Sequence, residues 1–151
     1  MTIHPDTLTT FFKDYERASN SCDTDRLLAQ FTETFTVTTP QGPQLVCAED
    51  FARILPRRSA LFNSLGCRAV TLHSLQVTSY NNHFALVDTT WKFHFELSDN
   101  RTDEFNVNST FMVYINRNDP KIFLYVPHQD IMEILRERRI LIATPEKSST
   151  A

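Results

Sequence analysis

The sequence contains only two glycines, Gly42 and Gly66, among its 151 residues. A phosphate-binding loop and the G-x-S-x-G turn of serine hydrolases each need several glycines close together, because the backbone there takes conformations that side chains obstruct. Two widely separated glycines cannot build either motif. Both kinds of site are therefore excluded.

Metal-binding and disulfide patterns are missing as well. The three cysteines, Cys22, Cys47 and Cys67, are odd in number and form no C-x-x-C pair, which favours reduced thiols over a disulfide framework or a zinc site. The five histidines show neither H-x-H nor H-E-x-x-H spacing. We therefore expect no metal and no other cofactor.

Charge and hydrophobicity limit the partners. The chain has 15 basic and 18 acidic residues, and the basic residues form no stripe interleaved with aromatic side chains, so nucleic acid is not an expected partner. No apolar run approaches the roughly 18 residues that a membrane span needs. Residues 1–20 also lack the apolar segment of a secretion signal. We expect a cytoplasmic protein that does not bind a membrane.

What the chain does contain is enough hydrophobic sequence for one core, in two differently patterned halves. The 41% hydrophobic content and 12 phenylalanines suit a single domain. Residues 5–65 show helical spacing, whereas residues 67–128 are rich in strand-forming residues. This order predicts an α+β fold, a cone-shaped curved antiparallel sheet with N-terminal helices packed on its concave face. We expect one domain over 1–144 and a disordered tail over 145–151.

The first half predicts helices separated by one hairpin. Helical spacing of apolar residues covers 6–19, and a second short helix begins after Asp23. Residues 34–47 indicate extended chain with a turn at 40–43. Helical spacing returns over 48–65, where Pro56 predicts a kink or two helices meeting, since proline costs roughly 3 kcal/mol inside a helix.

The second half predicts a strand meander followed by a helix with an apolar stripe at Ile131, Ile134, Leu135 and Leu141. Asn81-Asn82 and Asn118-Asp119 are the expected tight links, and the expected strands cover 68–80, 83–97, 104–116 and 121–128. Alternation in the second strand directs Trp91 toward the helices and His94 away from them. In the third strand, Ser109 interrupts the apolar face, so we expect a polar atom in the interior.

Several short segments resemble one known superfamily. Residues 15–23 (YERASNSCD), 27–31 (LLAQF) and 37–42 (VTTPQG) resemble the start of the nuclear transport factor 2-like cone fold. Residues 123–128 (FLYVPH) are similar to the last strand of SnoaL-like chains. The superfamily includes ketosteroid isomerase, SnoaL-like polyketide cyclases and many uncharacterised small proteins. The resemblance implies a pocket in the cone and, for many members, pairing through the outer face of the sheet.

The resemblance also assigns residues to the roles of the isomerase. Tyr15 matches the tyrosine that donates a hydrogen bond to the substrate oxygen. Thr39 stands where the isomerase has its aspartate base, and Ser109 falls at or near the second acid. A hydroxyl cannot accept a carbon-bound proton at neutral pH as a carboxylate can. Steroid isomerisation is therefore not expected.

The remaining candidates each have a structural alternative. Trp91 is either a core residue or a platform for a flat ligand. His128 either starts the last helix or reaches the pocket as an acid, base or donor. We take His128 and Tyr15 as candidate catalytic residues. The candidate ligand contacts are Tyr15, Thr39, Trp91, Ser109 and Tyr125.

Three functional hypotheses follow. The first is a protein that binds a small apolar or aromatic molecule in a hydrophobic cone, with or without a reaction. The second is a SnoaL-like isomerase, cyclase or dehydratase, in which Tyr15 and Ser109 orient a carbonyl and His128 moves a proton. The third is an interaction module with a filled cone. The outer sheet face carries Thr90, His94, Met112 and Tyr114, so we also expect a homodimer through this face.

Overall fold

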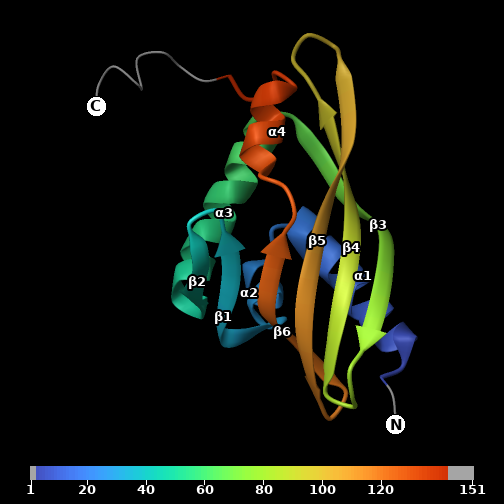
Figure 1. The fold of residues 1–151 in the computed structure, drawn as a ribbon. Coiled ribbons are helices and arrows are strands. Elements are labelled where there is room, and N and C mark those ends of the chain that lie inside the picture. The colour runs from blue at the N-terminus through green and yellow to red at the C-terminus, as the bar shows by residue number, and fades with distance from the viewer. Residues whose placement is uncertain (1–2, 143–151) are drawn as a thin grey trace.

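One curved, open sheet of six strands has helices packed against it in the computed structural model, which describes residues 3–142 (Figure 1). The tail expected over 145–151 lies outside the described residues. The α+β class and the cone-like arrangement predicted from the sequence are confirmed. No helix within residues 3–142 is both long and apolar enough to cross a bilayer.

The described elements follow the expected order. The helices are α1 (Pro5–Asn20), α2 (Thr24–Leu28), α3 (Ala48–Ser64) and α4 (Ile131–Glu137). The strands are β1 (Phe31–Thr39), β2 (Gly42–Cys47), β3 (Cys67–Ser79), β4 (Phe84–Glu96), β5 (Thr102–Asn116) and β6 (Asp119–Pro127). Most bounds differ from the predicted ones by one or two residues. The exceptions are β1, which begins three residues earlier than expected, and α4, described below.

The prediction of a wholly antiparallel sheet is wrong at one pair of strands. The strand order is β2-β1-β6-β5-β4-β3, and β3 to β6 form the predicted antiparallel meander. The strand β1, however, is parallel to β6, with Val37 opposite Tyr125. This pairing joins segments from opposite ends of the chain, so no local pattern indicates it. It places the β1–β2 hairpin beside the end of the meander (Figure 1).

Two helix predictions are wrong in part. Of the two alternatives expected at Pro56, a kink or two helices meeting, the second is wrong, because α3 is one helix that runs through Pro56. Pro56 is exposed, so water can satisfy the carbonyl that loses its amide partner. The helix α4 is shorter than its apolar spacing suggests, because Arg139 takes a left-handed φ of 59° just after the C-cap. Leu141 therefore lies beyond the helix, although it still packs against the core.

The core lies between α1 and the inner face of the sheet. Leu8 and Phe12 of α1 are fully buried, and the ring centroid of Phe12 is 5.0 Å from that of Phe111 on β5. Burial alternates along β4 as predicted, with Trp91 buried at 6% exposure and Asp88 exposed on the opposite face. The predicted assignment of the two faces of this strand is confirmed.

Candidate ligand-binding cavity

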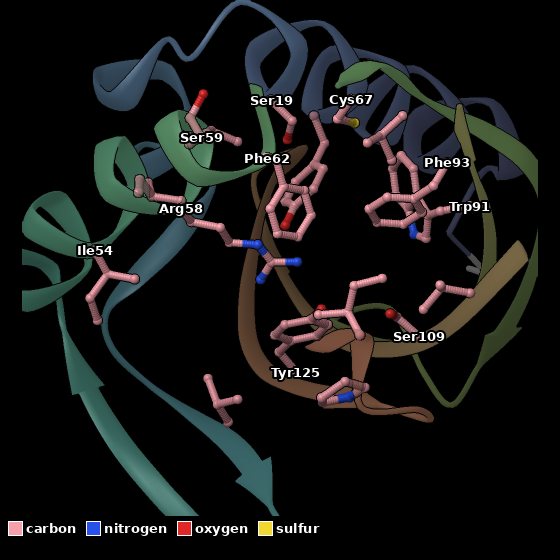
Figure 2. Close-up of a pocket in the computed structure, with 18 of the residues that line it drawn as sticks. Ser19, Ile54, Arg58, Ser59, Phe62, Cys67, Trp91, Phe93, Ser109 and Tyr125 are labelled. Carbon is pink, nitrogen blue, oxygen red and sulfur yellow. The ribbon is translucent and has the colours of Figure 1, made fainter. Parts of the chain in front are cut away.

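A cavity of about 700 Å³ lies between α1, α3 and the inner face of the sheet. This volume is within the range of pockets that hold small organic molecules. Much of its wall is aromatic, from Phe31, Phe51, Phe62, Trp91, Phe93 and Phe111. The cone is therefore hollow at its centre, and Figure 2 shows side chains from several elements directed into it.

Trp91 is held in this wall by a relay of hydrogen bonds. Its indole Nε1–H donates to Thr89 Oγ1 at 2.8 Å, and the Thr89 hydroxyl donates to the carbonyl oxygen of Ser109 at 2.8 Å. Thr89 is itself buried, at 3% exposure. Because its N–H is already engaged, Trp91 offers a ligand only the carbon surface of its ring.

The Ser109 hydroxyl points into the cavity, as the strand pattern predicted (Figure 2). The residue is 3% exposed. Its carbonyl accepts the bond from Thr89, whereas its hydroxyl has no hydrogen-bond partner within residues 3–142. The side chain is therefore available to donate to, or accept from, a ligand.

Tyr15 enters the cavity from α1. Its ring centroid lies 5.6 Å from that of Trp91 and 5.8 Å from that of Phe111. Burial raises the pKa of the phenol well above its usual value, and Tyr125 adds to this, while the positive charge of Arg58 opposes it. Tyr15 is thus a neutral hydroxyl at physiological pH. No partner for this hydroxyl lies within the described residues.

Tyr125 lies on the cavity wall near Ser109 (Figure 2). It is directly opposite Phe111 in the sheet register, and the two rings stack with centroids 4.9 Å apart and planes 6° apart. The structure therefore brings Tyr15, Trp91, Ser109 and Tyr125 to one cavity. All four were candidate ligand contacts from the sequence.

Thr39 occupies a different kind of position. It lines the edge of the cavity, but its hydroxyl donates to the Gly42 carbonyl at 2.8 Å and accepts from the Gln41 amide at 3.2 Å. These two bonds close the β1–β2 turn. The Thr39 hydroxyl is therefore committed to the hairpin rather than presented to a ligand.

His128 borders the cavity, but its imidazole is bonded to the outer face of the sheet. Its Nε2 lies 2.7 Å from Thr110 Oγ1, and the Thr110 hydroxyl donates to Asp88 at 2.5 Å. Thr110 and Asp88 both belong to the outward-facing set of their strands. The structure therefore separates His128 from Tyr15, which lies inside the cone.

Arg58 is the cavity residue that the sequence analysis missed. It lies on α3, and Figure 2 shows its guanidinium extending toward the centre of the cavity. The carbon of this group lies 5.1 Å from the centroid of the Phe62 ring. Leu55, Arg58 and Phe62 have the spacing of one helix face, so an arginine among inward-facing apolar residues was the available signal.

The cavity has donors but lacks an available carboxylate. Among its described lining residues, Asp130 is the only one with a carboxylate, and this group accepts from the Met132 amide at 3.0 Å as the cap of α4. No group of three metal-ligand residues comes together within residues 3–142. The arrangement can hold and polarise a ligand oxygen, but it offers no unengaged carboxylate to take a proton from carbon.

Comparison with known proteins supports the fold. A family model described as NTF2-like protein (DUF6841) matches residues 5–130. The protein Aln2 from a Streptomyces species has a similar structure, with a TM-score of 0.69 and 9% identity over 89% of this chain and 98% of that chain. No curated protein matches the chain significantly in sequence.

Two further structural neighbours have names that suggest a reaction. A candidate polyketide cyclase from Xanthomonas campestris pv. campestris has a TM-score of 0.56 and 17% identity, covering 90% of this chain and 98% of that chain. A candidate scytalone dehydratase from Novosphingobium aromaticivorans has a TM-score of 0.62 and 13% identity, and the match covers 81% of this chain and 80% of that chain. At these identities the likeness shows a shared fold and does not transfer an activity.

Proposed function

The chain belongs to the NTF2-like family DUF6841, and from this premise we propose that it binds a small, largely apolar or aromatic molecule inside its cone. The observation that carries the proposal is a cavity of about 700 Å³ whose aromatic wall presents the hydroxyls of Tyr15 and Ser109. Apolar walls with a few convergent polar groups are typical of small-molecule sites.

The two hydroxyls define how the ligand is held. Neither has a hydrogen-bond partner within residues 3–142, and both belong to the cavity lining. A carbonyl or hydroxyl oxygen of the ligand would give Tyr15 and Ser109 their missing partner. A flat ring would lie against the carbon surface of Trp91 and the neighbouring phenylalanines. The bound molecule is therefore an oxygen-bearing, mostly aromatic compound.

Binding without chemistry is the function that this geometry supports best. A proton transfer inside the cone needs a base, but Asp130 caps α4 and the His128 ring is bonded to Thr110 on the outer face. The hollow cone also argues against the interaction module with a filled cone. We accordingly propose a binding protein rather than a scaffold.

The second candidate is an enzyme of the SnoaL-like type. Its support is that neighbours of the same fold are a candidate polyketide cyclase and a candidate scytalone dehydratase. In such an enzyme, Tyr15 and Ser109 would stabilise a developing oxyanion as neutral donors. His128 would move the proton only after releasing Thr110 and turning toward the cavity.

Two further parts of the proposal concern the oligomeric state of the protein and its cellular location. We propose a homodimer that buries the outer face of the sheet, where Met112 lies beside Leu86 and Leu124. We also propose that the protein acts in the cytoplasm, because Cys22, Cys47 and Cys67 are all free thiols.

The test compares two flat compounds that differ in one oxygen, 9-fluorenone and fluorene. Trp91 is the only tryptophan, so quenching of its fluorescence reports on the cavity wall. We expect fluorenone to bind about tenfold more tightly than fluorene, as for one or two hydrogen bonds made to an otherwise apolar ligand. Tyr15→Phe and Ser109→Ala should each remove most of this difference.

The control for these variants is Tyr114→Phe, which removes a hydroxyl from the outer face of the sheet. It should leave the affinities of both compounds unchanged. If neither compound binds the wild-type protein, the proposed function is wrong. If both bind equally well, the assigned role of the two hydroxyls is wrong.

A further inference from the structure

Arg58 is an exposed residue of α3 whose guanidinium extends into an otherwise largely apolar cavity (Figure 2). It projects from α3 across the Phe62 ring, with the guanidinium carbon 5.1 Å from the ring centroid (Figure 2). Its charge is close enough to lower the pKa values of both Tyr15 and Cys67, against the larger effect of burial. The positive charge of Arg58 therefore affects groups inside the cavity.

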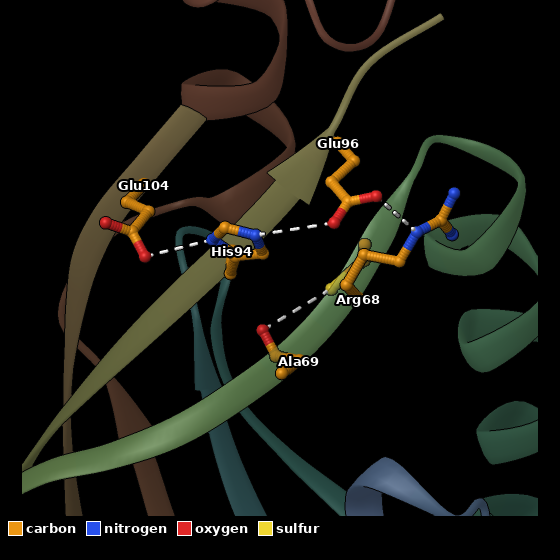
Figure 3. Close-up of polar contacts among 6 residues, drawn as sticks. Arg68, Ala69, His94, Glu96 and Glu104 are labelled. Carbon is orange, nitrogen blue, oxygen red and sulfur yellow. Dashed lines mark hydrogen bonds and ion pairs between the residues drawn. The ribbon is translucent and has the colours of Figure 1, made fainter. Parts of the chain in front are cut away.

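Arg58 has no carboxylate partner within residues 3–142. The second arginine in the cavity wall, Arg68, provides the comparison. Its Nε lies 3.4 Å from the Glu96 carboxylate, and Glu96 is also 3.9 Å from His94, which in turn bonds to Glu104 at 2.9 Å (Figure 3). Arg68 is therefore neutralised by the outer-face network, whereas Arg58 is not.

The rest of the lining does not offset this charge. Asp130 is the only carboxylate among the described lining residues, and it is engaged as the cap of α4. Apart from the two arginines and His128, the remaining polar lining residues, Tyr15 and Ser109 among them, carry hydroxyl, amide or thiol groups. The cavity thus combines aromatic walls with one uncompensated cation, a combination that favours an anionic ligand.

We propose that the ligand is an aromatic carboxylate, with its ring among the aromatic side chains of the wall and its carboxylate paired with Arg58. This inference rests on the proposed function, because it uses the same cavity, and it adds the charge of the ligand. Guanidinium suits this role since its planar array of donors can bond both oxygens of a carboxylate at once. The stacking of Arg58 on Phe62 orients this array toward the interior.

The experiment compares anthracene-2-carboxylate with anthracene-2-carboxamide, which has nearly the same shape and no charge. Both affinities are measured by isothermal titration calorimetry. For the wild-type protein, we expect the carboxylate to bind about tenfold more tightly than the amide, as for a charge-assisted hydrogen-bonded pair. Raising the salt concentration should weaken carboxylate binding and leave amide binding unchanged.

Arg58→Gln should abolish the preference for the carboxylate, so that the carboxylate and the amide bind with about equal affinity. Arg57→Gln is the matched control, because it removes the same charge from the neighbouring position on α3, outside the cavity lining. This control variant should retain the tenfold preference. Retention of the preference in Arg58→Gln, or its equal loss in both variants, overturns the inference.

The outcomes also separate this inference from the proposed function. Equal binding of carboxylate and amide by the wild-type protein supports a binding cavity and overturns the assignment of an anionic ligand. Failure of both compounds to bind overturns the proposed function for flat aromatic ligands of this size, and the inference with it.

Discussion

The indole of Trp91 is bonded to Thr89, two residues earlier on the same face of β4, with Nε1 and Oγ1 2.8 Å apart. The Thr89 hydroxyl then donates to the Ser109 carbonyl on β5. One buried hydroxyl therefore satisfies a tryptophan on its own strand and a carbonyl on the next. This relay orients the aromatic wall and leaves the Ser109 side chain available for a ligand.

Thr89→Val should therefore be more destabilising than its small change in shape suggests. It removes the acceptor for the Trp91 N–H and the extra donor to Ser109, leaving buried polar groups without partners. We expect the free energy of unfolding to fall by about 1–3 kcal/mol. Urea unfolding followed by Trp91 fluorescence measures this value.

The control is Thr90→Val, because Thr90 lies on the outward face and is partly exposed. Its hydroxyl donates to the Asn108 side chain at 2.9 Å, but water can replace this partner. Thr90→Val should therefore lower the free energy of unfolding by less than about 1 kcal/mol. Equal costs for the two variants would show that the buried relay has no special importance for stability.

Gly66 is the position where a methyl group should be least tolerated. It has a φ of 98°, and a Cβ atom would lie 2.1 Å from the Glu96 carbonyl oxygen. The Gly66 carbonyl also accepts from the Glu96 amide at 2.8 Å, so the two segments cannot easily separate. We expect Gly66→Ala to lower the free energy of unfolding by more than about 3 kcal/mol, since strain and overlap add.

Gly42→Ala separates the strain from the overlap. Gly42 has a φ of 112°, but no atom lies within 4 Å of its would-be Cβ. We expect Gly42→Ala to lower the free energy of unfolding by about 1–2 kcal/mol, because only the backbone conformation is strained. Chemical denaturation of both variants measures the difference, and comparable costs would contradict the close approach of Gly66 to β4.

The raised pKa of the Tyr15 phenol leads us to expect that the folded protein loses stability at alkaline pH. Burial raises the pKa of this phenol in the folded protein, whereas in the unfolded chain it ionises near its usual value of about 10. Above that pH the unfolded state has lost a proton that the folded state retains. The free energy of unfolding should therefore decrease as pH rises, by up to about 1.4 kcal/mol per pH unit for this group.

Tyr15→Phe should remove this part of the pH dependence, and denaturation between about pH 9 and pH 11 measures it. The comparison variant is Tyr80→Phe, because Tyr80 is 60% exposed. The Cys67 thiol, whose pKa burial also raises, contributes equally to both variants. If Tyr15→Phe retains the wild-type slope, the Tyr15 phenol is not held neutral by the fold.

Much of the fold could be predicted because its signals are local. Alternation along β4 and β5 placed Trp91 and Ser109 inside, since a period of two depends only on neighbouring residues. The parallel pairing of β1 with β6 depends on contacts between segments that are distant in the sequence, so no local sequence pattern indicates it. The unbroken path of α3 through Pro56 likewise depends on the exposure of that proline.

The site was less predictable, because its chemistry depends on which partners are already taken. Thr39 and His128 have suitable side chains near the cavity, but the Gly42 carbonyl and the Thr110 hydroxyl engage them. Sequence position cannot reveal such competition. Arg58 was missed for the opposite reason, since a charged residue in a helix is normally assigned to the solvent face.

The outer face of the sheet leads to the last prediction. Leu86, Met112 and Leu124 lie side by side on adjacent strands, and all three are partly exposed on the side away from the cavity. We expect a symmetric dimer that buries this patch, because apolar side chains gathered on a sheet face favour association. Size-exclusion chromatography with light scattering at micromolar concentration should give twice the mass of the chain.

Met112→Glu should convert this dimer to a monomer, since the symmetric interface would bury two unpaired charges. Gln44→Glu is the charge-matched control on β2, an edge strand three places from β5 in the sheet order, and it should remain dimeric. Far-ultraviolet circular dichroism establishes that both variants are folded. A monomeric wild-type protein would contradict the dimer itself, whereas a dimeric Met112→Glu variant would contradict the placement of its interface on this face.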